Sequence, residues 1–285
     1  MYNKLNINYF FEVIKIMFFV LKNIHFYFFR IFKKRILIKR NSKAIIIANG
    51  PSLEFDIIVL KDLINKDNFD LFCVNNFAIS DLFFDLKPDF YFFSDHLFWR
   101  DDLKDDFLND RNYLFERILT VDWPLTIISL PGAKNKFSVA FGSNPHIRVI
   151  KINYLPLNLS FDSLYYFVFK FNIGDIFNIN SATSLFWILL RSKYESIDLF
   201  GVDFSGFQNL TPENKSNTSS HFYKNIKSEN NLDNKYTINV SKSMSYRFYQ
   251  IYMGFRAFDI LEYISSKSKI KVKNYSSKSY VKNFI

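Results

Sequence analysis

KAIIIANGPSLEFD, residues 43–56, is the stretch that decides the fold of this chain. The apolar run from Ala44 to Ile47 leads into the turn Asn49-Gly50-Pro51-Ser52, and a helix-like stretch begins at Leu53. This order predicts a buried strand, a tight turn and a helix, which together open an α/β fold. A strand that stops in such a turn usually presents backbone N–H groups and short polar side chains to a ligand beyond its end.

Length and composition indicate a globular protein with a charged arm. The chain has 285 residues, of which 49% are hydrophobic, so it can bury a full core. Its single cysteine, Cys73, excludes an internal disulfide and suits a reducing compartment such as the cytoplasm. The net charge is +10, but residues 1–43 hold ten basic side chains and one acid, so the rest is nearly neutral. This distribution argues against a nucleic-acid-binding body.

The arm, residues 1–42, is predicted to form a basic amphipathic helix. On a helical wheel its polar residues fall within an arc of roughly 120°, and the remaining positions are mostly large and apolar. These polar residues are Lys4, Asn8, Glu12, Lys15, Lys22, Asn23, Arg30, Lys33 and Lys34. A helix buried against the domain is one interpretation. We favour a helix lying on an anionic membrane surface, because so wide an apolar face is rare on a soluble helix and a basic cluster follows it.

A membrane span and a signal peptide are not expected from the arm. Glu12, Lys15 and Lys22 interrupt every apolar window of about 20 residues. No small-residue cleavage site follows the arm either.

Residues 43–285 are predicted to form one α/β domain with a mainly parallel sheet, because short apolar runs alternate with helix-like stretches. The expected strands are 44–48, 70–74, 90–93, 125–130, 147–152, 196–200 and 269–274. The expected helices are 53–66, 181–193 and 244–266. Between them, residues 205–243 contain eight Asn and little apolar content, which predicts a lid, with disorder as the alternative.

Polar residues gather at the ends of the predicted strands, where ligands of open α/β sheets bind. They are Asn49, Gly50, Ser52, Asn75, Asn76, Ser94, Asp95 and His96. A later helix begins at Asn180-Ser181, where Ser181 can cap and free N–H groups can receive an anion. Asn75 and Asn76 could instead only terminate a strand. Neutral amides and hydroxyls suit a sugar and a nucleotide base better than a triphosphate, and no P-loop, GxGxxG, HExxH or CxxC motif occurs.

Several segments in order resemble one known family. They are "AIIIANGPSL", "LFCVNNF", "FFSDHLFW", "NINSATSLFWILLRSKYESIDLFGVDF" and "KIKVKNYSSKSYVKNF". Together they are similar to the bacterial lipooligosaccharide sialyltransferases of glycosyltransferase family 42, from about Lys43 to the C-terminus. The resemblance implies a Rossmann-like GT-A variant that uses CMP-sialic acid, needs no metal or other cofactor, inverts the anomeric centre and closes a lid. It also implies a homo-oligomer. From the basic arm, by contrast, we expect the chain on the cytoplasmic face of the inner membrane.

The resemblance assigns donor-binding roles to four residues. Asn49 and Ser52 match the family's donor turn, Asn75 its second-strand asparagine, and Ser181 a hydroxyl near the sugar carboxylate. Gly50, Ser94 and Asn180 complete the expected donor site.

Other positions depart from the family pattern. Asn178 replaces an expected arginine, Ser205 replaces an expected tyrosine, and Asn225 stands where the lid histidine would act as the base. The nearby His221 is therefore our candidate base, and Tyr223 our candidate for stabilising the phosphate. Either the lid is rearranged or the donor is a CMP-sugar other than CMP-sialic acid.

A histidine suits the base because its ordinary pKa is close to cellular pH. His96 rivals His221 because it follows a strand end, whereas His25 lies on the arm and His146 precedes a strand. We expect Asp203 to fix a loop rather than to react. The acidic run of Asp101, Asp102, Asp105 and Asp106 alternates with basic residues, which is typical of a solvated helix face and not of a metal site.

The sequence thus predicts a membrane-associated glycosyltransferase that moves an acidic sugar from a CMP-sugar to a surface glycan such as lipooligosaccharide, lipopolysaccharide or capsule. One alternative is a Rossmann-like protein that binds ATP and magnesium, resembling hydroxymethylpterin diphosphokinases or flagellar accessory factors, which share a GPSL-type turn. Another is a membrane-anchored scaffold without catalysis.

Overall fold

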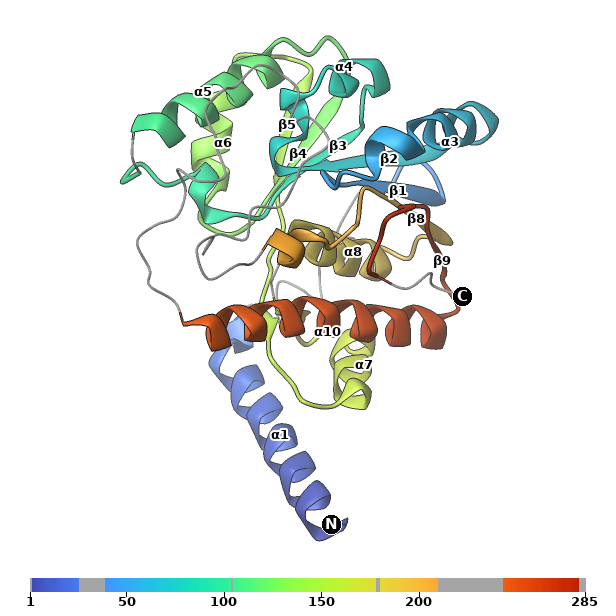
Figure 1. Ribbon diagram of the computed structural model, residues 1–285. Coiled ribbons are helices and arrows are strands. Elements are labelled where there is room, and N and C mark those ends of the chain that lie inside the picture. Colours follow the sequence, from blue (N-terminus) through green and yellow to red (C-terminus); the bar gives the residue numbers. More distant parts are fainter. Residues whose placement is uncertain (1, 26–38, 104, 178–179, 210–242, 282–285) are drawn as a thin grey trace.

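A parallel sheet of seven strands forms the centre of the molecule, with helices on both faces (Figure 1). The computed structural model describes residues 2–25, 39–103, 105–177, 180–209 and 243–281, and every statement below concerns these residues. The strand order is β5-β4-β3-β2-β1-β8-β9, and all neighbouring pairs run parallel. The strands are β1 Lys43–Ile47, β2 Phe69–Val74, β3 Phe90–Phe93, β4 Leu125–Ser129, β5 Ile147–Lys151, β8 Ser196–Phe200 and β9 Lys271–Asn274. The predicted α/β class with a mainly parallel, Rossmann-like sheet is confirmed.

Helices cover the two faces in separate groups, as Figure 1 shows. One face carries α3 Leu53–Lys66, α4 Leu82–Leu86, α5 Asp105–Leu119 and α6 Lys134–Phe141. The other carries α7 Asp162–Lys170, α8 Ser181–Arg191 and α10 Met244–Ser268, with a small parallel pair of strands, β6 Pro156–Leu157 and β7 Asp175–Ile176. Three 3₁₀ turns, η1 Asn75–Ile79, η2 His96–Phe98 and η3 Gly206–Asn209, follow β2, β3 and β8. The molecule is therefore a three-layer α/β sandwich.

The apolar run of β1 is buried on both of its faces. Ala44 and Ile46 pack into the core beneath α8 and α10, whereas Ile45 and Ile47 pack into the core beneath α3. Successive strand residues point to opposite sides of a sheet, so a strand with helices on both sides needs a continuous apolar run rather than an alternating one. This explains why KAIII reads as a central strand.

The expected strand and helix positions agree with the structure to within about two residues at most ends. The helices α4, α6 and α7 and the β6–β7 pair were not expected. The predicted solvated helix over the acidic run begins only at Asp105. Asp101 lies before that helix, where it accepts a hydrogen bond from Lys136, and the neighbouring Asp102 pairs with Arg100. Among the described residues, no group of His, Cys, Asp and Glu could hold a metal ion.

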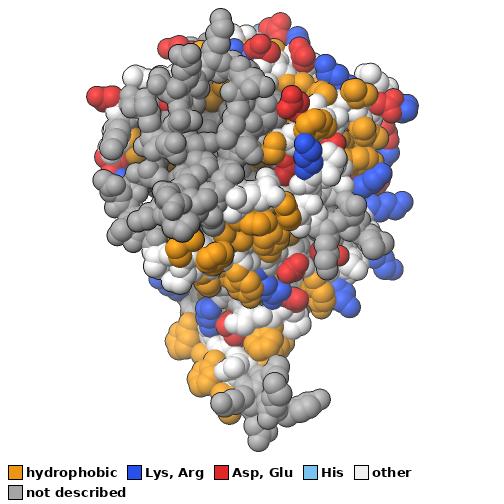
Figure 2. Space-filling view, in the orientation of Figure 1, with side chains coloured by type: hydrophobic (Ala, Val, Ile, Leu, Met, Phe, Trp, Pro, Cys, Tyr) orange, Lys and Arg blue, Asp and Glu red, His pale blue; other side chains and the backbone are white. Residues whose placement is uncertain are grey.

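The N-terminal helix α1, Tyr2–Lys22, packs one face on the body and leaves another exposed. Ile16 is buried, Ser160 donates a hydrogen bond to Glu12 (3.0 Å), and Lys15 donates one to the carbonyl of Asn158. The polar edge near Glu12 therefore contacts the protein. The exposed apolar residues on the arm are Ile7, Tyr9, Phe10, Phe11, Met17, Phe18, Leu21 and Ile24. Figure 2 shows hydrophobic side chains along this arm, which projects below the body.

The remaining predictions for the arm, residues 26–38, lie outside the described residues. In the described part, no helix has the length and apolar character needed to cross a membrane.

A buried aspartate fastens α8 to the small β6–β7 pair. Asp175 is fully buried and accepts hydrogen bonds from the Trp187 indole (2.9 Å) and the Leu155 backbone N–H (2.6 Å). It also pairs with Arg191, which is itself almost buried. Because both charges are removed from water, each depends on the other.

Replacing Asp175 with Ala should lower the free energy of unfolding by about 3–5 kcal/mol, because the Arg191 guanidinium would remain buried without its carboxylate. Urea denaturation followed by circular dichroism measures this loss. The control is Asp122→Ala, which removes an exposed ion pair with Lys87 and should cost less than about 1 kcal/mol. Similar losses in the two variants would contradict the role given to Asp175.

Candidate functional site

The site lies where the strand order changes direction. From β1 the chain adds β2, β3, β4 and β5 on one side, whereas β8 and β9 lie on the other side. The carboxyl ends of β1 and β8 thus diverge into loops that leave in opposite directions, and ligands of open α/β sheets bind at such a point. A cavity of about 580 Å³ opens here. This volume lies within the range of small-molecule sites.

Two glycines hold β1 and β8 together beyond the end of the sheet. The Gly50 N–H donates to the Gly201 carbonyl (2.8 Å), and Gly201 has a φ of +64°. A Cβ on Gly50 would lie 2.4 Å from that carbonyl and 2.6 Å from the Asp203 carboxylate. Only glycine fits this approach without displacing the backbone. The predicted turn after β1 therefore depends on close backbone contact between Gly50 and Gly201.

Asp203 connects this turn to the loop after β8. Its Oδ2 accepts a hydrogen bond from the Ser52 backbone N–H at 2.7 Å, at the start of α3. Burial raises the pKa of the Asp203 carboxyl, and this hydrogen bond opposes part of the rise. We expected Asp203 to fix a loop; the structure shows that it fixes the turn after β1 and lines the cavity.

A row of amides and hydroxyls crosses the cavity wall from β2 to α8. The Asn75 side-chain amide donates to Ser181 Oγ (2.6 Å), and Ser94 Oγ lies 2.6 Å from the same atom. Asn75 has a φ of +49°, and the Tyr91 hydroxyl, which donates to the Asn75 carbonyl, holds this left-handed conformation in place. Asn75 Oδ1 is buried and accepts no hydrogen bond within the described part of the chain, so it can receive one from a ligand.

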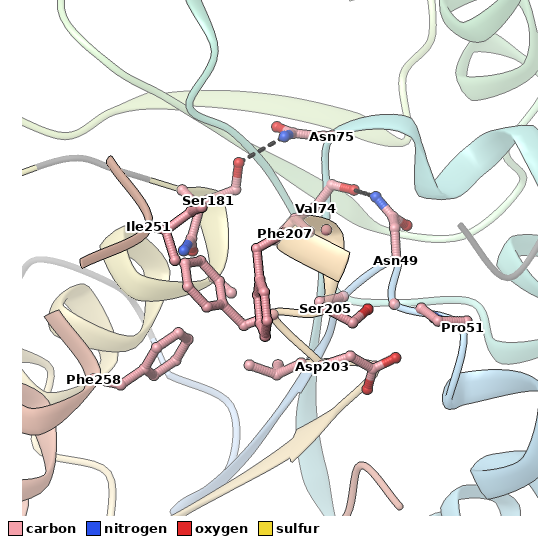
Figure 3. A pocket seen from close by; sticks show the side chains of 18 of the residues that line it. Asn49, Pro51, Val74, Asn75, Ser181, Asp203, Ser205, Phe207, Ile251 and Phe258 are labelled. Carbon is pink, nitrogen blue, oxygen red and sulfur yellow. Dashed lines mark hydrogen bonds between the residues drawn. The ribbon is translucent and has the colours of Figure 1, made fainter. Parts of the chain in front are cut away.

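Figure 3 shows how the predicted residues lie around the cavity. Asn75 and Ser181 face one another, whereas Asn49 turns its amide to the Val74 carbonyl (3.1 Å). Asn49 thereby joins the ends of β1 and β2 while it lines the cavity. Asn49, Gly50, Asn75, Asn180 and Ser181 all line this single cavity, so five of the seven predicted donor-site residues come together.

Two predicted residues lie behind the wall. Ser52 is fully buried at the start of α3, with helical backbone angles, and does not line the cavity. Ser94 is buried too and reaches the cavity only through its contact with Ser181. Both therefore support the wall and do not line it.

The cap of α8 is Asn180, not Ser181 as the sequence suggested. Asn180 Oδ1 accepts a hydrogen bond from the Thr183 N–H at 2.9 Å. Asn and Ser are similarly good caps, so the residue type alone could not decide between neighbours. The shift of one position leaves the Ser181 hydroxyl available to the row of amides and hydroxyls.

The histidines are resolved only in part. His221 and Tyr223, the candidate base and phosphate partner, lie outside the described residues, as does Asn178. His96 does not line the cavity; it is exposed, and its Nδ1 lies 3.4 Å from Asp95, which does line it. His25 and His146 are exposed away from this wall.

We did not expect α10 to complete the cavity, whereas η3 lies at the start of the predicted lid. Phe207, Ile251 and Phe258 form an apolar side, next to the carboxamide of Gln250. The Phe204 ring fills a notch at Gly254, where a Cβ would lie 1.9 Å from it, and the Phe204 and Phe207 rings both contact Phe255. We call this set, Phe204, Phe207, Gly254 and Phe255, the aromatic clamp. In the sequence, the signal for this close packing was Gly254 inside the predicted helix 244–266.

Comparison with models of known families, with curated proteins and with solved structures found no match.

Gly50→Ala should lower the free energy of unfolding by about 1–3 kcal/mol and weaken ligand binding, because the new methyl group collides with the Gly201 carbonyl. Urea denaturation measures the first effect. Gly174→Ala is the control: its Cβ would make only van der Waals contacts at 3.4 Å, and we expect a loss of about 0.5 kcal/mol or less. An unchanged stability of Gly50→Ala would refute the close approach of the two glycines.

Proposed function

We propose that this protein is a metal-independent, inverting glycosyltransferase, related to the sialyltransferases, that moves sialic acid or another acidic sugar from a CMP-sugar onto a cell-surface glycan. The observation that supports this most is the row formed by Asn75, Ser94 and Ser181 at the divergence of β1 and β8. It offers neutral donors and acceptors in a cavity with an apolar side formed by Phe207, Ile251 and Phe258. Such a wall suits the hydroxyls of a sugar and a pyrimidine.

The proposed reaction needs two tasks beyond binding. The acceptor hydroxyl attacks the anomeric carbon, the bond from that carbon to the CMP phosphate oxygen breaks, and CMP leaves with the electron pair. A base must take the hydroxyl proton, and a hydrogen-bond donor must stabilise the departing phosphate. We assign the first task to His221 and the second to Tyr223.

Attachment to a membrane is part of the proposal. The exposed stripe of α1 includes Phe10, Phe11 and Phe18, each more than half exposed. Stripes of this kind mark interaction surfaces. The basic residues that follow α1 in the sequence suit an anionic bilayer surface. We place the enzyme on the cytoplasmic face of the inner membrane, where it would meet glycolipid acceptors.

Release of CMP from CMP-sialic acid and related CMP-sugars, measured with lipooligosaccharide fragments as acceptors, tests the activity. Replacing His221 with Ala should lower kcat by at least about 100-fold, the contribution expected of a general base. His96→Ala should change kcat by less than about threefold, as should the control His146→Ala. If kcat fell at least about 100-fold in His96→Ala and stayed normal in His221→Ala, His96 would be the base instead.

The alternative function makes a different binding prediction. An ATP-dependent Rossmann-like enzyme should melt at a higher temperature with ATP and magnesium than with CMP. Our proposal expects the opposite order in a thermal-shift assay. Stabilisation by ATP and magnesium alone would refute the proposal.

The double variant Phe11→Glu, Phe18→Glu should bind vesicles of phosphatidylglycerol and phosphatidylethanolamine at least tenfold more weakly than the wild type, because the lipid contact would lose two exposed phenyl rings. Co-sedimentation with vesicles measures this. Val139→Glu, on the most exposed apolar residue of α6, is the matched control and should bind like the wild type. Equal sedimentation of all three proteins would exclude α1 as the attachment site.

A further inference from the structure

No cationic side chain is found among the described residues that line the cavity. Of the lining residues that the structure describes, the charged ones are Asp95 and Asp203, and neither Lys, Arg nor His is among them. A CMP-sugar carries a phosphodiester and, if the sugar is acidic, a carboxylate. Two acids in the wall repel both groups, so an anionic donor needs a positive charge from beyond the lining.

Arg247 lies where such a charge could come from. The face of α10 turned to the cavity carries Gln250, Ile251 and Phe258, and Gly254 of the aromatic clamp lies on the same face. Arg247 precedes these residues by three, four, eleven and seven positions, so it shares their face. It is one helical turn, about 5.4 Å, before Gln250 and Ile251.

The side chain of Arg247 has a buried nitrogen without a hydrogen-bond partner among the described residues. The residue is half-buried, its Nε is buried, and no described residue accepts a hydrogen bond from that nitrogen. The first turn of α10 contains no acidic residue, and within the described chain no carboxylate forms an ion pair with Arg247. Arg256, on another face of the same helix, pairs with Asp162. Burying an unpaired guanidinium N–H is costly, so a partner is expected.

The position of Arg247 is also unfavourable for the helix. The first turn of a helix carries the positive end of the macrodipole and disfavours cations. An anion bound there would interact favourably with both the dipole end and the guanidinium. Stability of α10 therefore gives no reason for an arginine at this position, whereas binding of an anion does.

We propose that Arg247 binds the anionic centre of the donor, the phosphate or the sugar carboxylate, and so replaces the cation that the cavity wall lacks. This inference rests on the proposed function. Arg247 contacts the donor directly and sets the preference of the site for charged over neutral ligands.

Calorimetric titration of the full-length protein with cytidine, CMP and CMP-sialic acid tests this role. If the phosphate is the partner, Arg247→Gln should bind CMP and CMP-sialic acid about 10- to 100-fold more weakly, the effect of one hydrogen bond to a charged group, while cytidine binds as before. If the carboxylate is the partner, the same loss appears with CMP-sialic acid and not with CMP. Arg247→Lys should recover part of the affinity. Arg256→Gln is the matched control and should bind all three ligands like the wild type.

The outcomes separate the inference from the proposed function. Equal binding of both CMP ligands by the wild type and Arg247→Gln would overturn the role of Arg247 alone. A wild type that binds neither CMP nor CMP-sialic acid overturns the proposed function and the inference with it. A parallel loss of cytidine binding in Arg247→Gln would show general damage to the cavity and also overturn the role.

Discussion

The approach of Gly50 to Gly201 is the constraint on which the rest of the site depends. Their backbone hydrogen bond extends the pairing of β1 and β8 past the last strand residues, and no side chain fits between them. This contact places Asp203 beneath the turn after β1, where it receives the Ser52 N–H. The loops after β1 and β8, which are far apart in sequence, thus form one wall of the cavity. The hydrogen bond from Ser52 also fixes the start of α3.

The opposite wall depends on α8, whose residues are almost all buried. Asn180 caps the start of this helix by accepting a hydrogen bond from the Thr183 N–H. The Asp175–Arg191 pair holds the other end of the helix. The Asn180 cap and the Asp175–Arg191 ion pair hold the two ends of α8 in place. Ser181, in the first turn, is thereby positioned on this side of the site so that its hydroxyl is hydrogen-bonded to both Asn75 and Ser94.

The strands and the polar residues at their ends could be predicted because each depends on neighbours in sequence. Apolar runs with sharp turns define β1, β2 and β8, and parallel pairing brings their carboxyl ends together. Other features depend on tertiary contacts that local patterns do not carry. Ser52 and Ser94 have suitable side chains but lie behind the wall, and the contribution of α10 follows from packing of Phe204 into Gly254. The contacts of Glu12 and Lys15 with the body could not be read from a helical wheel, which shows only that a polar edge exists.

The aromatic clamp has a consequence for the segment between η3 and α10. The clamp joins the residues just before that segment to the helix just after it, since Phe204 and Phe207 both contact Phe255. The two attachment points are therefore fixed by packing and not by the segment itself. The entropy of closing a loop between fixed points grows slowly, by about 0.6 kcal/mol for each doubling of its length. The clamp therefore keeps η3 beside α10 independently of how many residues connect them.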